Sequence, residues 1–144
     1  MFGKTAFRLA VVMFVLVGAT IAQGQDKIQN YFNDIAAKVK ATTDPAQKRE
    51  VLTKSFESMV NSLNKVQGSP LVTENDKVGI EKLKVIIGEK QDELAGRNGF
   101  QRVPDAELNA FAVYVVQDME QAEQTVTISL VALLLIILIA VLVL

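Results

Sequence analysis

The sequence predicts an all-α fold, a small antiparallel bundle of about four amphipathic helices. Apolar residues recur at alternating spacings of three and four along the middle of the chain, which is the period of one helix face. Short segments rich in Gly, Pro, Asp and Asn separate these stretches. No run of alternating apolar and polar residues, typical of a half-buried strand, competes with them. With 144 residues, the chain is expected to form one domain.

The N-terminal segment is typical of a signal peptide. Lys4 and Arg8 form a basic start, and an apolar stretch over residues 9–19 follows. Small residues then continue to Gly24, at the spacing that a signal peptidase recognises. We therefore expect residues 1–24 to be a signal peptide that directs the rest of the chain out of the cytoplasm. The alternative is an uncleaved membrane helix, for which the apolar stretch is short.

The exported helical domain is expected to span residues 25–124 and to begin with two helices. The first has an apolar face made of Ile28, Phe32, Ile35 and Val39. Asp44 then has the residue type of a helix N-cap, Pro45 suits the first helical position, and Gln47 suits a capping box. The second helix has a heptad-like face made of Leu52, Phe56, Met59, Leu63 and Val66. Gly68 and Pro70 are expected to end it.

A third helix is expected to begin near Thr73 or Asn75, because either residue is a good cap. Its apolar face would be Ile80, Leu83, Ile87 and Leu94. Gly79 and Gly88 lie nine residues apart and therefore on opposite faces, which argues against a single glycine groove. Gly96 is expected to end this helix.

The fourth helix is expected to begin at Pro104 and Asp105, after a loop that contains Asn98 and Gly99. Its apolar face would be Leu108, Phe111 or Ala112, Val115, Met119 and Ala122. No Gly or Pro separates this helix from the C-terminal segment, so residues 105–144 are predicted to form one rod of about 60 Å. A looser helical hairpin and a coiled-coil oligomer are the alternatives to the antiparallel bundle.

The chain finishes with an apolar segment, which we predict to be a C-terminal transmembrane anchor over residues 125–144. Fifteen of the nineteen residues in 126–144 are Leu, Ile or Val. As a helix these nineteen residues would be about 28 Å long, close to the ~30 Å hydrocarbon core of a bilayer. The alternative is a buried core helix, but a domain of this size can hardly surround a helix that is apolar on every face.

The flanking charges predict how this anchor is oriented. No Lys or Arg follows Arg102, and the residues just before the anchor include Asp118, Glu120 and Glu123. Cytoplasmic flanks are normally basic, so we expect the bundle outside the cytoplasm and the C-terminus at the cytoplasmic face. A GPI signal would need a small residue where Glu120 stands, and a sortase signal would need basic residues after the apolar segment.

The composition argues against most kinds of chemistry. The chain has no Cys and no His, which removes the thiolate nucleophile, the commonest general base and the commonest metal ligands. The net charge of −1 does not suit nucleic-acid binding. We therefore predict no catalytic, cofactor-binding or metal-binding residues, no cofactor and no nucleic-acid partner. Charged pairs on the helices, Lys77 with Glu81 and Lys90 with Asp92, are interpreted as solvated surface.

One weak catalytic pattern is present. Ser62 and Lys65 match the S-x-x-K spacing in which a lysine activates a serine, but the companion motifs of that enzyme class are missing. A solvated helix face explains the match. The main hypothesis is therefore a non-enzymatic adaptor, assembly or structural protein of the cell envelope, periplasmic or extracellular, with the bilayer and a homo-oligomer or helical protein as partners. The alternative is a lipid-surface protein whose helices open onto the membrane, and an unrecognised enzyme is the third hypothesis.

Overall fold

The computed structural model describes residues 28–143, and within them the chain is all-helical. The elements are α2 (Ile28–Ala41), α3 (Pro45–Gln67), α4 (Glu74–Ala95), the 3-10 helix η2 (Asp105–Glu107), α5 (Leu108–Thr125) and α6 (Leu130–Val143). This part of the chain contains no strand. The predicted all-α helical bundle is confirmed for these residues. The predicted signal peptide, residues 1–24, lies outside the described part.

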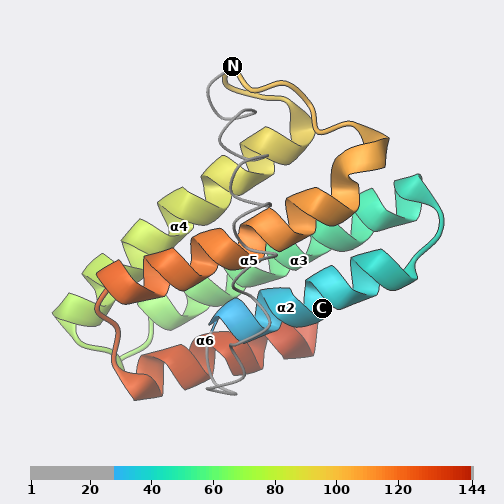
Figure 1. Cartoon of the computed structure of the whole chain (residues 1–144). Coiled ribbons are helices and arrows are strands. Elements are labelled where there is room, and N and C mark those ends of the chain that lie inside the picture. Colours follow the sequence, from blue (N-terminus) through green and yellow to red (C-terminus); the bar gives the residue numbers. More distant parts are fainter. Residues whose placement is uncertain (1–27, 144) are drawn as a thin grey trace.

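Successive helices run in opposite directions, as an up-and-down bundle requires (Figure 1). Helix α3 lies at the centre of the arrangement and packs against α2, α4, α5 and α6. Helix α5 packs along α2, whereas α4 makes few close backbone contacts with α5. Helix α6 lies along the lower side of the bundle in Figure 1, where it packs mainly on α3 and also touches α2.

The predicted apolar faces form the core. The five heptad-like residues of α3 are each at most 1% exposed, and the predicted faces of α2 and α4 are buried as well. Aromatic side chains connect three of the helices. Phe56 of α3 lies between Phe32 of α2 and Phe111 of α5, with ring centroids 5.7 Å and 6.4 Å away. The 3.6-residue pattern therefore located the core, because it reports which side chains must leave water.

The helix ends agree with the sequence prediction at α4 and differ at α3. Thr73 caps α4 and forms a full capping box with Asp76, and Gly96 ends the helix in the left-handed conformation with φ of 78°. Pro45 is the first residue of α3, as predicted, but the side chain of Asp44 makes no capping hydrogen bond. The capping box predicted for Gln47 is therefore wrong. Pro45 has no backbone N–H, so one fewer N–H group at the start of α3 needs a side-chain cap.

The predicted continuous rod over residues 105–144 is wrong. A 3-10 turn replaces its start, α5 ends at Thr125, and Val126 has the extended conformation with φ of −102° and ψ of 128°. After residues 126–129 the chain turns back, and α6 lies against the bundle (Figure 1). Three consecutive β-branched residues, Val126 to Ile128, weaken the helix here because their side chains lose χ1 freedom in a helix. None of the helices within residues 28–143 combines the length and the apolar character that crossing a bilayer requires.

Candidate functional site: the exposed face of the C-terminal helix

Helix α6 carries a large exposed aliphatic surface. Seven of its side chains are exposed large hydrophobics: Leu130, Val131, Leu134, Leu138, Val141, Leu142 and Val143. Their exposed fractions run from 45% at Leu134 to 74% at Leu142. Soluble monomers rarely present such a contiguous apolar surface to water, and such surfaces commonly mark sites of protein or membrane contact. Val143 lies three residues after Ala140, on the buried side at the very end of the helix, so we call the other six residues the α6 outer face.

The fully buried side of α6 is a narrow strip of three residues. Only Ala132, Ile136 and Ala140 are fully buried, and they recur every four residues along one side of the helix. Alanine at two of these three positions lets the backbone of α6 approach α3 closely. Ser62 of α3 is also fully buried, and its hydroxyl donates a hydrogen bond to the carbonyl oxygen of Ile136. A side chain of α3 is thus bonded directly to the backbone of α6.

A second polar contact holds the start of α6. The Oδ1 atom of Asp76 accepts a hydrogen bond from the backbone N–H of Ser129 at 2.8 Å, and its Oδ2 atom accepts one from the Ser129 hydroxyl at 2.8 Å. The Ser129 oxygen in turn accepts from the backbone N–H of Ala132 at 3.3 Å, as an N-cap does. The hydrogen bond from the Ser129 backbone is the first cause that lowers the pKa of the Asp76 carboxyl below its ordinary value. We call the Asp76–Ser129 and Ser62–Ile136 contacts the docking contacts.

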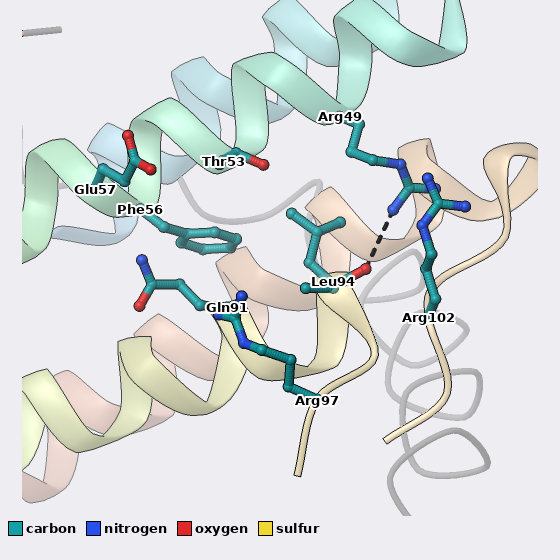
Figure 2. A pocket seen from close by; sticks show the side chains of 9 residues that line it. Arg49, Thr53, Phe56, Glu57, Gln91, Leu94, Arg97 and Arg102 are labelled. Carbon is teal, nitrogen blue, oxygen red and sulfur yellow. Dashed lines mark hydrogen bonds between the residues drawn. The ribbon is translucent and has the colours of Figure 1, made fainter. Parts of the chain in front are cut away.

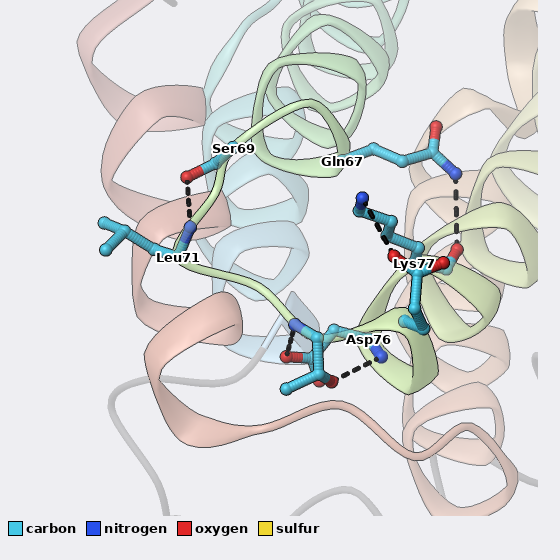
Figure 3. Close-up of polar contacts among 7 residues, drawn as sticks. Gln67, Ser69, Leu71, Asp76 and Lys77 are labelled. Carbon is cyan, nitrogen blue, oxygen red and sulfur yellow. Dashed lines mark hydrogen bonds and ion pairs between the residues drawn. The ribbon is translucent and has the colours of Figure 1, made fainter.

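Asp76 serves two helix ends at once. Its Oδ2 atom also accepts from the backbone N–H of Thr73 at 3.2 Å, and its own N–H donates to the Thr73 hydroxyl at 3.1 Å. Figure 3 shows Asp76 at the start of α4, beside the segment that leads into α6. Gly79, one turn along α4, brings the two segments together. A Cβ atom there would lie 2.6 Å from the carbonyl oxygen of Thr127.

The end of α5 is fixed to the start of α2. The two carboxylate oxygens of Glu123 accept hydrogen bonds from the backbone N–H groups of Ile28 and Gln29, each at 3.0 Å. A carboxylate at a helix N-terminus satisfies unpaired N–H groups and complements the helix dipole. No ionisable side chain follows Glu123 in the sequence. Helices α2 and α5 are therefore connected by hydrogen bonds just before the point where the uncharged C-terminal segment begins.

The S-x-x-K residues do not form a solvated face together. Ser62 is buried beneath α6 and bonded to Ile136, whereas Lys65 is exposed. The interpretation of Ser62 as a surface residue is wrong, because the rod predicted for the C-terminal segment left α3 uncovered there. The observed role of Ser62 is to contact α6.

Lys90 is also buried, contrary to the sequence interpretation. It is 1% exposed and pairs with Glu93 at 2.8 Å and with Asp118 of α5, rather than with Asp92. Its ammonium group also donates to the Tyr114 hydroxyl at 2.9 Å and lies 4.1 Å from the centre of that ring. Burial acts to lower the pKa of Lys90, but the carboxylates of Asp118 and Glu93 outweigh it and raise the pKa above its ordinary value. This cluster is the main polar link between α4 and α5.

The predicted surface pair of Lys77 with Glu81 is also not the one observed. The ammonium group of Lys77 pairs with Glu74 at 3.2 Å, three residues before it on α4. Glu81 instead lies beside Lys84 and Gln67, and the bond from Gln67 is the first cause of its lowered pKa. These residues remain at the surface, so their interpretation as solvated charges is right for the location and wrong for the partners.

A pocket of about 240 Å³ opens between α3 and the C-terminal end of α4 (Figure 2). Phe56 and Leu94 contribute its apolar lining, and Arg97 and Arg102 contribute cationic side chains. Arg97 pairs with Asp92 at 3.2 Å, and the third cation, Arg49, binds three acceptors. Its Nη1 atom donates to the Leu94 carbonyl at 3.1 Å, and its Nη2 atom donates to the Val103 carbonyl at 2.7 Å and to Asp105 at 2.8 Å. Arg49 is thus a cross-link between α3 and the loop after α4.

Within residues 28–143, no three His, Cys, Asp or Glu side chains gather where they could hold a metal ion. Comparison with known proteins gave no match: no family model fits the chain, and neither a curated protein nor a solved structure is significantly similar to it. The α6 outer face is therefore the feature on which a functional argument can be built. The apolar composition identifies the segment, but it does not indicate that one side of α6 is bonded to the bundle.

Proposed function

We propose that this chain is a non-enzymatic, exported helical-bundle protein that attaches to a membrane through residues 126–144 and acts there as an adaptor, assembly or structural protein. The observation that supports membrane attachment most strongly is the α6 outer face, six aliphatic side chains that the bundle leaves in water. The absence of any charge after Glu123 supports the same proposal, because a charged side chain in this segment would resist entry into lipid.

The free energy available from this surface is large enough for attachment. Fully burying a Val or Leu side chain gains ~1.5–3 kcal/mol, and each residue of the outer face is roughly half exposed, which leaves about 1 kcal/mol per side chain. Six such side chains would therefore contribute on the order of 5–6 kcal/mol when they enter lipid. Part of this gain is offset by the cost of immobilising the protein at the membrane.

The proposed orientation places the bundle outside the cytoplasm and, when the segment spans the bilayer, the C-terminus at the cytoplasmic face. The acidic residues Asp118, Glu120 and Glu123 precede the segment, and no Lys or Arg lies between Arg102 and the C-terminus. Basic residues normally flank the cytoplasmic side of a membrane segment, so this flank favours the outer side.

A second candidate function is attachment to a lipid surface without spanning it. The observation that favours it is the position of α6, which lies lengthwise along the bundle with its outer face turned away from α3. In this arrangement the outer face would enter the interface while Ala132, Ile136 and Ala140 stay on α3. The polar faces are not rich in Lys and Arg, so the attraction would be apolar rather than electrostatic.

A homo-oligomer or a helical protein partner remains part of the proposal. The heptad-like residues of α3 are buried inside the bundle and cannot form a seam with another chain. Self-association would therefore use the α6 outer face, and it would compete with lipid for the same side chains. Sedimentation of the full chain in the presence and absence of vesicles measures this competition, since lipid binding should reduce the oligomer.

Charge substitutions on the outer face test membrane attachment. Leu134→Glu/Leu138→Glu changes two side chains that are 45% and 55% exposed, so the bundle should still fold. The matched control is Val78→Glu/Val85→Glu, which changes two side chains of α4 that are 57% and 66% exposed. Flotation of the full chain with phosphatidylcholine vesicles measures binding.

We expect the α6 pair to lose about 100-fold in vesicle partitioning, ~1.4 kcal/mol for each tenfold step. The α4 pair should float like the unsubstituted chain. Equal binding by both pairs, or no flotation of the unsubstituted chain, would contradict the proposal. Glutamate keeps the helix propensity of these positions high, so a difference would reflect lipid contact rather than loss of the helix.

A further inference from the structure

We infer that α6 has two positions, the docked position on α3 and an undocked position in a bilayer, and that the docking contacts set the balance between them. This inference rests on the proposed membrane attachment and adds its regulation. The occupant of the surface on α3 is the chain's own C-terminal segment. The competitor for that segment is lipid.

In the docked position, the bundle covers only part of the apolar surface of α6. Three of the fourteen residues of α6 are fully buried, and two of the three are alanines. Four larger side chains pack against the core only in part: Leu133, Leu135, Ile137 and Ile139. Others, Leu130, Leu134 and Leu138 among them, are exposed. Hydrophobic stabilisation follows the apolar area removed from water. A bilayer would cover the side chains that α3 leaves exposed, so lipid competes favourably with α3 for this segment.

Hydrogen bonds compensate for this incomplete burial of apolar side chains in the docked position. The carboxylate of Asp76 accepts two hydrogen bonds from Ser129, and hydrogen bonds to a charged group are stronger than those between neutral groups. The hydroxyl of Ser62 donates to the Ile136 carbonyl in the buried contact between α3 and α6. Docking is thus held at the start and near the middle of α6 by bonds that a bilayer cannot reproduce.

The rest of the bundle can keep its structure when α6 leaves. Asp76 retains its bonds with Thr73, so the capping box of α4 survives the loss of Ser129. Glu123 still ties the end of α5 to Ile28 and Gln29. Ser62 would meet water, which replaces the lost hydrogen bond of a hydroxyl at small cost. The non-helical residues 126–129 supply the joint about which the segment would move.

Spin labels measure the two positions directly. The chain has no Cys, so Lys82→Cys on α4 and Leu142→Cys on α6, both at exposed positions, carry the only labels. The full chain is measured by double electron–electron resonance in buffer and with increasing phosphatidylcholine vesicles. We expect one narrow distance distribution in buffer and its loss on vesicles.

Weakening the docking contacts should shift the balance toward lipid, although the hydrogen bond from the Ser129 N–H to Asp76 is retained. The variant Ser62→Ala/Ser129→Ala deletes both hydroxyls and leaves Asp76 and its bonds to Thr73 in place. We expect it to lose the docked distance at about tenfold lower lipid concentration, which corresponds to ~1.4 kcal/mol. Ser129→Ala alone, in the linker outside every helix, should shift it in the same direction by less. The matched control, Ser69→Ala, removes a hydroxyl that accepts from the Leu71 N–H in the turn after α3, shown in Figure 3.

The outcomes separate this inference from the proposed function. Vesicle-bound protein that keeps the docked distance would overturn the two positions and leave membrane attachment standing, as lipid-surface binding. A double variant that titrates with lipid like Ser69→Ala would overturn the role of the docking contacts. Failure of every form to bind vesicles would overturn both the inference and the proposed function.

Discussion

Lys90→Met should be among the most damaging single substitutions in this bundle. The ammonium group of Lys90 is the only cation in its buried cluster, where it pairs with Glu93 and Asp118 and donates to Tyr114. Methionine fills a similar volume but carries no charge. The two carboxylates, whose side chains are 7% and 25% exposed, would then face each other across the α4–α5 contact without a counter-ion.

The expected loss of stability is about 3–5 kcal/mol at neutral pH, the usual cost of removing one partner from a buried ion pair. The estimate needs little reduction for solvent screening, because the Lys90 side chain is 1% exposed. Adding Glu93→Gln to the Lys90→Met chain should recover part of the loss, since it removes one of the two repelling charges. The two substitutions should therefore be strongly non-additive.

Urea unfolding followed by circular dichroism measures these differences. Lys82→Met is the matched control, because Lys82 lies on the same helix at an exposed position, and it should change the free energy of unfolding by less than ~0.5 kcal/mol. A loss below 1 kcal/mol for Lys90→Met, or additive effects of the two cluster substitutions, would refute the reasoning that this cation neutralises a buried acidic pair.

Two further predictions concern stability. Burial raises the pKa of Tyr31 from 10.0 to about 12, so its contribution is fully present below pH 10 and is lost as the pH rises from 10 to 12. We expect the chain to lose roughly 2–3 kcal/mol over this range, with a smaller loss in Tyr31→Phe, as alkaline urea titrations would measure; equal pH dependence in both chains would contradict this assignment. Gly79→Ala should destabilise the chain by ~1–3 kcal/mol, because the added Cβ would lie 2.6 Å from the Thr127 carbonyl oxygen, whereas Gly88→Ala meets nothing within 4 Å and should stabilise it by up to ~1 kcal/mol. Thermal unfolding measures both, and a stabilising Gly79→Ala would show that residues 126–129 do not lie on α4.

The helices and their buried faces were largely predictable from the sequence. Periodicity identifies the side chains that must leave water, and Thr73 and Gly96 are residue types suited to the ends of α4 that they form. Lys90 could have been placed inside by the same reasoning, because it lies three residues after Ile87 and four before Leu94. The charge of Lys90 argued against burial, because a lysine is seldom buried without partners. Its partner Asp118 lies on another helix and gives no local signal in the sequence.

The return of α6 onto the bundle was harder to predict. The signal was local: three β-branched residues, Val126 to Ile128, followed by Ser129, a good N-cap. An unbroken apolar composition concealed it, because hydropathy alone does not distinguish a helix that continues from one that turns. The residues that hold α6 on the bundle are distant in sequence: Asp76 is 53 residues from Ser129, and Ser62 is 74 residues from Ile136. No local pattern reports such distant partners.

The most direct test of the account is whether the C-terminal segment enters lipid. The chain has no Trp, so Leu138→Trp places a single fluorophore on the α6 outer face, and Val85→Trp places the control on the exposed side of α4. Both full-length variants are mixed with vesicles whose acyl chains carry bromine, which quenches only fluorophores within the hydrocarbon. Membrane attachment through α6 predicts a blue shift and strong quenching for Leu138→Trp and neither for Val85→Trp. An unshifted, unquenched Leu138→Trp on chains that co-float with the vesicles would contradict it.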